Sequence, residues 1–137
     1  MVQKDLKILV VDDERTIVEL TTTILSHEGF SVIGTTDPEE ALRWIEREPS
    51  IEVLILDVMM GKTTGPEIIR RAQRDRERKF RVLFMTGGFD GVRFRQTDRI
   101  LQKPWSGAEL VGELRRVLSD VPQHAAWNGP ERRSSAA

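Results

Sequence analysis

Three runs of four apolar residues divide the chain, at 8–11, 53–56 and 82–85, and polar residues bound each run. The apolar residues in each run are continuous rather than alternating. A strand with one face in water alternates, whereas a continuous run is typical of a strand buried on both faces, as in a parallel sheet covered by helices. Two weaker strands are predicted at 30–35 and 99–102, so the pattern predicts a five-stranded parallel sheet.

Helical spacing and helix start signals fill the segments between these strands. Apolar residues recur at i, i+3, i+7 and i+8 in Ile17, Leu20, Ile24 and Leu25. Three more helices are predicted by their start signals, which are Asp37-Pro38, Gly65-Pro66 and the capping box of Ser106 with Glu109. Strands that alternate with helices imply right-handed crossovers. The fold class is therefore α/β, a three-layer flavodoxin-like (βα)5 sandwich.

The segment between the fourth and fifth strands is too short and too rich in glycine for an ordinary helix. It spans 17 positions (103 − 86) and contains three glycines without a helical pattern. Each glycine disfavours a helix by up to about 1 kcal/mol relative to alanine. We expect the fourth helix to be short or irregular, with residues 87–98 largely irregular.

The apolar pattern stops near Asp120, which predicts a domain over 1–119 and a C-terminal tail over 120–137 without an output domain. No apolar run exceeds four residues, whereas a membrane span needs roughly 20. Met1–Lys7 lacks the apolar region of a secretory signal. We therefore expect a cytoplasmic protein that does not enter a membrane.

Composition excludes several kinds of chemistry. The 21 basic and 22 acidic residues leave a formal net charge of −1, which argues against binding nucleic acid by bulk electrostatics. Cysteine is absent, which excludes disulfides and thiolate sites. The two histidines, His27 and His124, are interpreted as a helix-end residue and a tail residue rather than as metal ligands.

Three aspartates follow two of the predicted central strands. Asp12 and Asp13 come directly after 8–11, and Asp57 comes directly after 53–56. These strands are neighbours in the flavodoxin-like order, so the three carboxylates should converge at the carboxyl edge of the sheet. Two like charges about 5 Å apart repel by about 3 kcal/mol at an effective dielectric near 20, which favours a bound cation, and oxygen ligands favour Mg²⁺. The alternative is that each aspartate caps the next helix, which explains one aspartate better than three.

Two further polar residues reach the same edge. Thr86 ends the fourth strand and Lys103 ends the fifth. A phosphorylated carboxylate needs a cationic group on its phosphoryl oxygens and a hydroxyl that hydrogen-bonds one of them. Taken singly, each has an ordinary explanation: threonine favours strands, and a lysine before proline is usually solvated.

Motifs at five places, in order, resemble the response-regulator receiver domain of two-component signalling. They are Val10-Val11-Asp12-Asp13-Glu14, Leu56-Asp57-Val58-Met59-Met60, Gly65 eight residues after the aspartate, Met85-Thr86-Gly87 and Gln102-Lys103-Pro104. The resemblance covers about residues 5–119. It implies no metabolic activity, only self-phosphotransfer and autophosphatase chemistry.

The resemblance also implies a role for each matching residue. Asp57 would be the phosphoacceptor, taking a phosphoryl group from a phosphohistidine. Asp12, Asp13 and Asp57 would hold Mg²⁺ together with the backbone carbonyl of Met59. Lys103 would pair with Asp57 and later with the phosphate.

Thr86 would move toward the phosphoryl group, and Pro104 would follow a cis peptide bond. The chain also departs from the family pattern. Gly61 and Thr63 stand where the family usually has proline and often has methionine, so we expect a more mobile loop after the phosphoacceptor. Ile100 replaces a common aromatic switch residue, so that switch cannot operate in its usual form.

The favoured function is a single-domain response regulator that acts as a signalling switch or phosphate relay. Its partners would be a sensor histidine kinase or histidine phosphotransfer protein and a downstream protein target, with no nucleic acid and no membrane. It would be a monomer or a weak phosphorylation-dependent dimer. Two alternatives remain open: an interaction module with vestigial phosphorylation, and the receiver segment of a hybrid histidine kinase.

A basic stretch from 70 to 81 is not explained by this function. Its members are Arg70, Arg71, Arg74, Arg76, Arg78, Lys79 and Arg81, and Asp75 and Glu77 interrupt it. One interpretation is a solvated face of the third helix and its exit loop. The other is a docking patch for an acidic partner surface.

Overall fold

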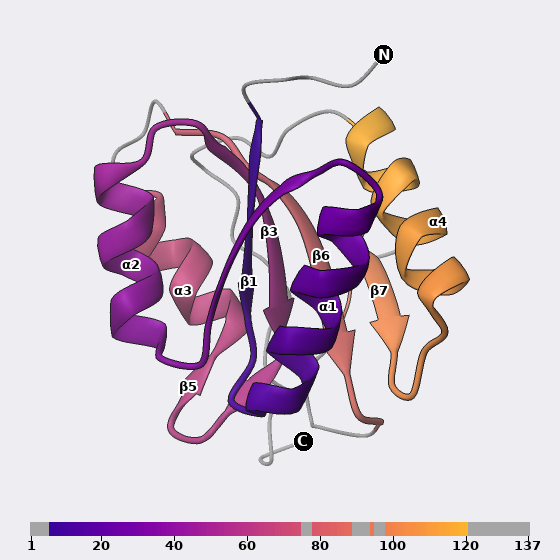
Figure 1. Cartoon of the computed structure of the whole chain (residues 1–137). Helices are drawn as coiled ribbons and strands as arrows, with labels where there is room; N and C mark the ends of the chain where they lie inside the picture. Colours follow the sequence, from indigo (N-terminus) through magenta and orange to yellow (C-terminus); the bar gives the residue numbers. More distant parts are fainter. Residues whose placement is uncertain (1–5, 75–77, 89–93, 95–97, 121–137) are drawn as a thin grey trace.

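Each of the three apolar runs lies within a β-strand. The structure is a computed structural model, and it describes residues 6–74, 78–88, 94 and 98–120. The runs lie in β1 (Lys7–Val11), β3 (Ile51–Asp57) and β6 (Arg81–Thr86), and the two weaker strands are β2 (Ser31–Thr35) and β7 (Arg99–Gln102). The five strands form one parallel sheet in the order β2-β1-β3-β6-β7, which confirms the predicted flavodoxin-like sheet (Figure 1).

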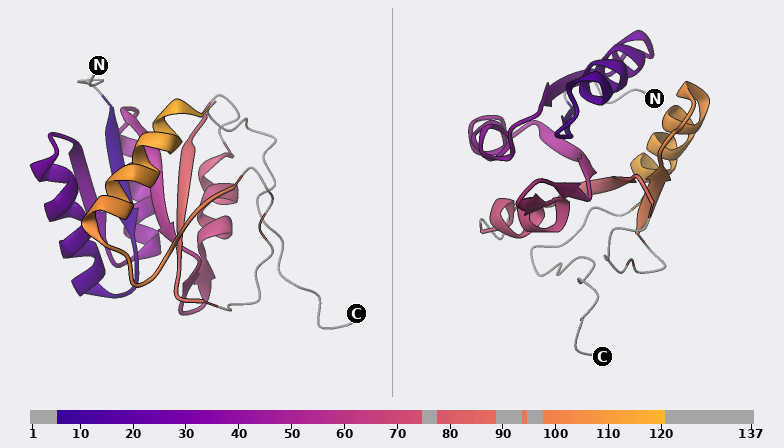
Figure 2. Two further views of the ribbon diagram at one scale, coloured as in Figure 1. Left: turned by 90° about the vertical axis from the view of Figure 1, so that its right-hand side faces the viewer. Right: turned by 90° about the horizontal axis from the view of Figure 1, so that it is seen from below.

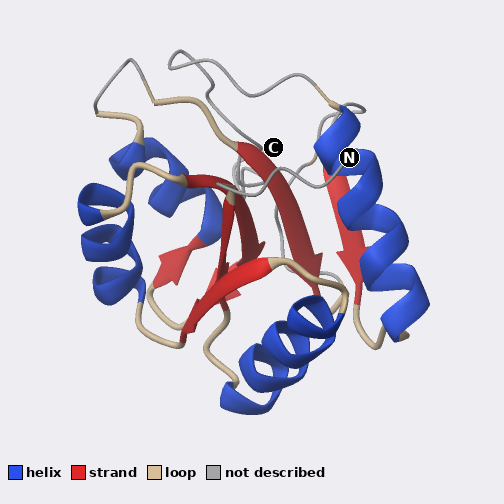
Figure 3. Ribbon diagram, turned by 45° about the horizontal axis from the view of Figure 1, so that its top comes forward, coloured by secondary structure: helices blue, strands red, loops and turns tan. Residues whose placement is uncertain are grey.

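Four helices in the described part of the chain cover the two faces of this sheet: α1 (Arg15–His27), α2 (Pro38–Arg47), α3 (Gly65–Ala72) and α4 (Gly107–Ser119). α1 and α4 lie on one face, and α2 and α3 lie on the other (Figures 1 and 2). Figure 3 shows the strands enclosed between the two helical layers. The three-layer sandwich predicted from the alternation of elements is therefore confirmed.

The predicted caps account for where the helices begin. The Asp37 carboxylate accepts a hydrogen bond from the Glu39 backbone N–H at 3.0 Å and so starts α2. Ser106 and Glu109 form the full capping box of α4, with bonds of 3.1 and 3.0 Å. His27 is the last residue of α1, as expected for a helix-end residue.

The continuous apolar runs divide into two cores because successive side chains of a strand point to opposite faces. Leu9, Leu54 and Phe84 pack in the core under α2 and α3. Their neighbours Val10 and Ile55 pack in the core under α1 and α4. These five residues are at most 1% exposed, so the continuous pattern reflects burial on both faces.

The loop after Asp57 forms an additional hairpin that the sequence pattern did not predict. β4 (Met59–Met60) pairs antiparallel with β5 (Thr63–Thr64) across a two-residue turn. Gly61 in that turn has φ +61°, a conformation that glycine adopts at little cost. The loop expected to be mobile thus has backbone pairing of its own. A glycine in a two-residue turn was the available signal, but each strand is too short to show a pattern.

Several expectations fall on residues outside the described ranges. Between β6 and β7 the structure describes only Gly87, Gly88, Phe94 and Asp98, so the predicted irregularity of 87–98 and the short fourth helix lie largely outside it. Within the tail, only Asp120 is described, and His124 lies outside. Among the described residues, no helix has the length and apolar character of a membrane span.

Candidate functional site

The predicted polar residues meet at the carboxyl edge of the parallel sheet, where the strand arrows of Figure 1 end. Asp12 follows the end of β1, Asp57 is the last residue of β3, and Thr86 is the last residue of β6. Lys103 follows β7, and its backbone N–H donates to the Thr86 carbonyl at 2.7 Å. The Lys103–Pro104 peptide is cis, as the resemblance implied.

The three aspartates form one cluster. Carboxylate oxygens of Asp12, Asp13 and Asp57 all lie within 4.8 Å of one another. Asp12 is fully buried and Asp57 is 6% exposed, whereas Asp13 is exposed. The Asp12 Oδ1 atom also accepts a hydrogen bond at 2.9 Å from the backbone N–H of Glu14, the N-cap residue of α1, but this bond lies before the first turn and does not cap the helix. Asp13 and Asp57 carry no helix-start bond in the described structure either.

The ammonium group of Lys103 lies among these carboxylates and is closest to Asp12. Its Nζ atom is 2.7 Å from Asp12 Oδ2, 3.6 Å from Asp57 Oδ2 and 3.8 Å from Glu14 Oε1. Burial opposes the charge of Lys103, but the hydrogen bond that Lys103 donates to Asp12 and the charges of Asp12, Asp57 and Glu14 together raise its pKa. Lys103 therefore stays cationic and pairs more tightly with Asp12 than with Asp57.

The negative charge of Asp57 is compensated by Lys103 less than that of Asp12 is. Burial is the largest cause that raises the pKa of Asp57, and the charge of Asp12 adds to it. Lys103 opposes this effect, but Asp13 contributes further in the same direction, and the pKa rises from 3.8 to about 7. A proton or a bound cation at Asp57 would therefore offset the unfavourable negative charge of its carboxylate near neutral pH.

The hydroxyl of Thr86 is held by the backbone of Gly88. Thr86 Oγ1 donates to the Gly88 carbonyl at 2.9 Å and accepts from the Gly88 N–H at 3.2 Å. Thr86 does not line the cavity beside Asp57. The structure therefore brings Thr86 to the predicted edge but directs its hydroxyl toward the following loop.

An open cavity of about 300 Å³ gives access to Asp57. Its lining consists of Asp13, Glu14, Asp57, Met59, Gly87, Gly88 and Lys103. Of these, Glu14 and Gly87 were quoted from the sequence only as members of motifs, without a role of their own. Glu14 continues the acidic pair Asp12-Asp13 in the chain, and that continuity was the signal that could have found it.

A glycine permits the backbone on the other side of Asp57 to approach closely. A Cβ atom at Gly65 would lie 2.8 Å from the Asp57 carbonyl oxygen and 3.3 Å from Leu56 Cβ. The Gly65 N–H donates to the Val58 carbonyl at 3.0 Å. The absence of a side chain at Gly65 thus lets the start of α3 pack directly against the end of β3.

The donor set of the cluster suits a hard divalent cation. Asp12 Oδ2 is buried and, apart from its ion pair with Lys103, has no hydrogen-bond partner among the described residues. Carboxylate oxygens with room for retained water favour Mg²⁺. The residues present therefore fit a bound Mg²⁺ ion.

A parallel sheet of this order, with acidic residues, a lysine and a threonine at its carboxyl edge, has the arrangement of a receiver domain. The family model of the response regulator receiver domain matches residues 8–115. The chain belongs to this family, whose members are the receivers of two-component signalling.

Curated relatives and solved structures agree with this assignment. The chain is 36% identical over 115 residues to the transcriptional regulatory protein CpxR of Escherichia coli K12, and 36% identical over 117 residues to the regulatory protein PhoP of Bacillus subtilis. Each match covers 82% of this chain but only 49% and 48% of the relative, so the chain spans about half the length of these relatives. The chemotaxis protein CheY4 of Vibrio cholerae superimposes with a TM-score of 0.71 at 26% identity over 82% of this chain and 98% of that one. The receiver domain of the hybrid histidine kinase CckA gives 0.70 at 28% identity over the same shares.

Proposed function

We propose that this chain is a phosphoacceptor receiver in which Asp57 takes a phosphoryl group from a phosphohistidine and thereby acts as a signalling switch or phosphate relay. The donor would be a sensor histidine kinase or a histidine phosphotransfer protein. The observation that carries the proposal is the position of Asp57, which lines an open cavity beside two further carboxylates and a lysine. The functional unit is residues 1–119.

The transfer forms one bond and breaks one. An Asp57 carboxylate oxygen attacks phosphorus, the phosphorus–nitrogen bond breaks, and its electron pair stays on the donor imidazole. Asp12, Asp13, Asp57 and the Met59 backbone carbonyl would hold the Mg²⁺. The bound ion would supply positive charge to the phosphoryl oxygens and the clustered carboxylates.

Lys103 and Thr86 act on the product. Lys103 Nζ, already 3.6 Å from Asp57 Oδ2, would pair with the phosphoryl oxygens and stabilise their charge. The Thr86 hydroxyl would exchange its bonds with Gly88 for a bond to the phosphoryl group. This exchange connects phosphorylation to the backbone that follows β6.

The proposed partners of the receiver are proteins rather than nucleic acid. The chain carries a formal net charge of −1, which gives no overall attraction to a phosphate backbone. The relatives named as transcriptional regulators are about twice as long as the segment that matches. The downstream target of this receiver would be bound in a phosphorylation-dependent way.

A small phosphodonor tests the proposed chemistry. Acetyl phosphate with Mg²⁺ should add one phosphoryl group, seen by mass spectrometry of the intact protein, and hydroxylamine should remove it because it cleaves an acyl phosphate. Asp57→Asn should abolish the mass increase, while Asp37→Asn, at an aspartate that caps α2 and is not a member of the acidic cluster, should retain it. A mass increase that persists in Asp57→Asn would assign the chemistry to another residue. No increase in the native chain would favour a module with vestigial phosphorylation.

A further inference from the structure

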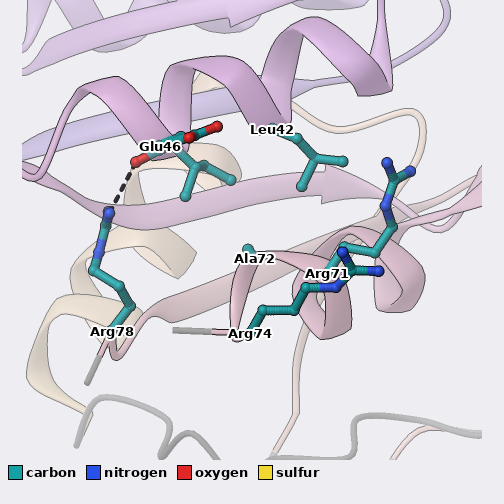
Figure 4. A pocket seen from close by; sticks show the side chains of 7 residues that line it. Leu42, Glu46, Arg71, Ala72, Arg74 and Arg78 are labelled. Atoms are coloured by element: carbon teal, nitrogen blue, oxygen red, sulfur yellow. Dashed lines mark hydrogen bonds between the residues drawn. The ribbon is translucent and has the colours of Figure 1, made fainter. Parts of the chain in front are cut away.

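A groove of about 430 Å³ lies between the second half of α2 and the end of α3. Leu42, Ile45 and Ala72 supply its apolar surface, and Arg71, Arg74 and Arg78 supply guanidinium groups. Figure 4 shows Leu42 and Glu46 on α2 facing Ala72 and the arginines across the groove. We refer to this set of residues as the α2–α3 groove.

Two of the three arginines are held in place by the fold. Arg71 forms two hydrogen bonds with the Glu39 carboxylate, at 2.7 and 3.0 Å. Arg78 donates to the Ile45 carbonyl at 2.8 Å and to the Ile51 carbonyl at 3.0 Å. These bonds tie the segment after α3 to the end of α2 and to the start of β3, so both walls of the groove are fixed.

Arg74 is different, because its exposed guanidinium group has no hydrogen-bond or ion-pair partner in the part of the chain that the structure describes. Arg78 donates to carbonyl groups rather than to a carboxylate, so its positive charge is not neutralised. Among the lining residues that the structure describes, Glu46 is the one carboxylate. With Arg71 paired to Glu39, this described part of the lining has an excess of positive charge beside an apolar surface.

We propose that the α2–α3 groove docks an acidic segment of a partner protein. An aliphatic side chain of that segment would lie against Leu42 and Ala72, which are partly exposed, and a neighbouring carboxylate would face Arg74 and Arg78. The apolar surface favours a protein over a nucleic acid, which would meet the arginines but leave Leu42 and Ala72 uncovered. The basic stretch of the sequence is thus a docking patch in part, with Arg71 and Arg78 also serving the fold.

The groove lies at the opposite end of the sheet from the phosphoacceptor. Arg78 bonds to Ile51, the first residue of β3, whereas Asp57 is the last. The two ends of this strand are about 20 Å apart at the usual rise per residue. A partner in the groove would leave the edge of Asp57 open to a kinase, so the proposal does not depend on phosphoryl transfer.

A model peptide tests the groove directly. The probe is a blocked peptide of alternating glutamate and leucine, titrated against the full chain by calorimetry and by amide chemical shifts. We expect shifts confined to α2 and α3 and a Kd that Arg74→Glu weakens on the order of tenfold. Arg70→Glu is the matched control, since Arg70 is exposed on the same helix but does not line the groove. It should change the Kd by less than about twofold.

Further variants separate the contributions of charge and apolar contact. Glu46→Gln should tighten binding, because it removes the carboxylate of the groove, and both Glu46 and Arg74 are exposed, so neither change should alter Tm. A peptide with serine in place of leucine should bind weakly. Equal weakening by Arg74→Glu and Arg70→Glu would overturn the proposal in favour of a diffuse charge effect. If the serine peptide or a single-stranded oligonucleotide bound as tightly as the leucine peptide, the proposal of a protein partner would be overturned.

Discussion

The side chain of Lys103 lies closer to Asp12 than to Asp57, and this difference sets the ionisation of the site. The Nζ atom is 2.7 Å from Asp12 Oδ2 but 3.6 Å from Asp57 Oδ2. Of the two buried carboxylates, Asp57 is therefore the one whose charge is less compensated, and its pKa is raised to about 7, first by burial and then by Asp12. In the absence of a cation, a proton on Asp57 relieves the repulsion within the cluster.

The raised pKa of Asp57 makes the metal-free protein less stable as pH increases. The unfolded carboxyl titrates near 3.8 and the folded one near 7, so between these values the folded state binds the extra proton. The stability that this proton provides is present at low pH and is lost as pH rises through about 7. In EDTA, Asp57→Asn, which mimics the neutral form, should raise Tm by several degrees at about pH 8 and by clearly less at about pH 5, where only part of the loss has occurred. The measurement is thermal unfolding of both proteins across this range. An equal effect at both pH values would show that the Asp57 carboxyl is ionised throughout.

Binding of Mg²⁺ should stabilise the folded chain, because the ion relieves the repulsion among the three carboxylates. A concentration five times the Kd should add about 1 kcal/mol to the free energy of unfolding, which corresponds to several degrees in Tm. Differential scanning fluorimetry with and without Mg²⁺ measures this increase. Asp13→Ala, at an exposed member of the cluster, should abolish the response without unfolding the protein. A melting curve that Mg²⁺ leaves unchanged would contradict the proposed metal site.

At the scale of elements, the packing of α1 on β2 depends on a missing side chain. A Cβ atom at Gly34 would lie 2.6 Å from Val18 Cγ1 and 2.7 Å from Thr22 Cγ2. Gly34→Ala should therefore lower the free energy of unfolding by about 1–3 kcal/mol, through overpacking. Chemical denaturation measures the change. Gly112→Ala is the control, because a Cβ atom at Gly112 meets nothing within 4 Å, and a helical alanine should stabilise α4 by up to about 1 kcal/mol.

Local patterns were enough to predict most of these elements. The apolar runs predicted the central strands, and Asp37 and Ser106 marked the starts of two helices correctly. The hairpin of β4 and β5 was missed because two-residue strands have no periodicity. The capping of the end of α2 by Arg78 was missed because it joins residues far apart in the sequence. Only tertiary structure brings such groups together.

The same distinction holds for the candidate site. Membership of the cluster followed from topology, since the carboxyl ends of parallel strands share one edge. The pairings within it did not follow, because differences of about 1 Å decide whether Lys103 favours Asp12 or Asp57. The bonds between Thr86 and Gly88 likewise depend on local backbone geometry that residue types alone do not specify.

At the scale of the whole molecule, the two ends of the sheet serve different contacts in the functions proposed above. The carboxyl edge carries Asp57 and the acidic cluster, and the opposite edge lies beside the α2–α3 groove. The layer formed by α2 and α3 connects them, because Gly65 packs against Asp57 and Arg74 follows the end of the same helix. A partner in the groove and a kinase at Asp57 could therefore bind at the same time.

The strand order also has a consequence for synthesis of the chain on the ribosome. β1 lies between β2 and β3, so the first three strands to emerge can pair with one another before β6 and β7 exist. Until β6 arrives, β3 is an open edge, and its residues Val53 to Leu56 are fully apolar. Such an edge is a template for pairing with other nascent chains. Chains that stop before β6 should accordingly aggregate, whereas completion of β6 closes the edge.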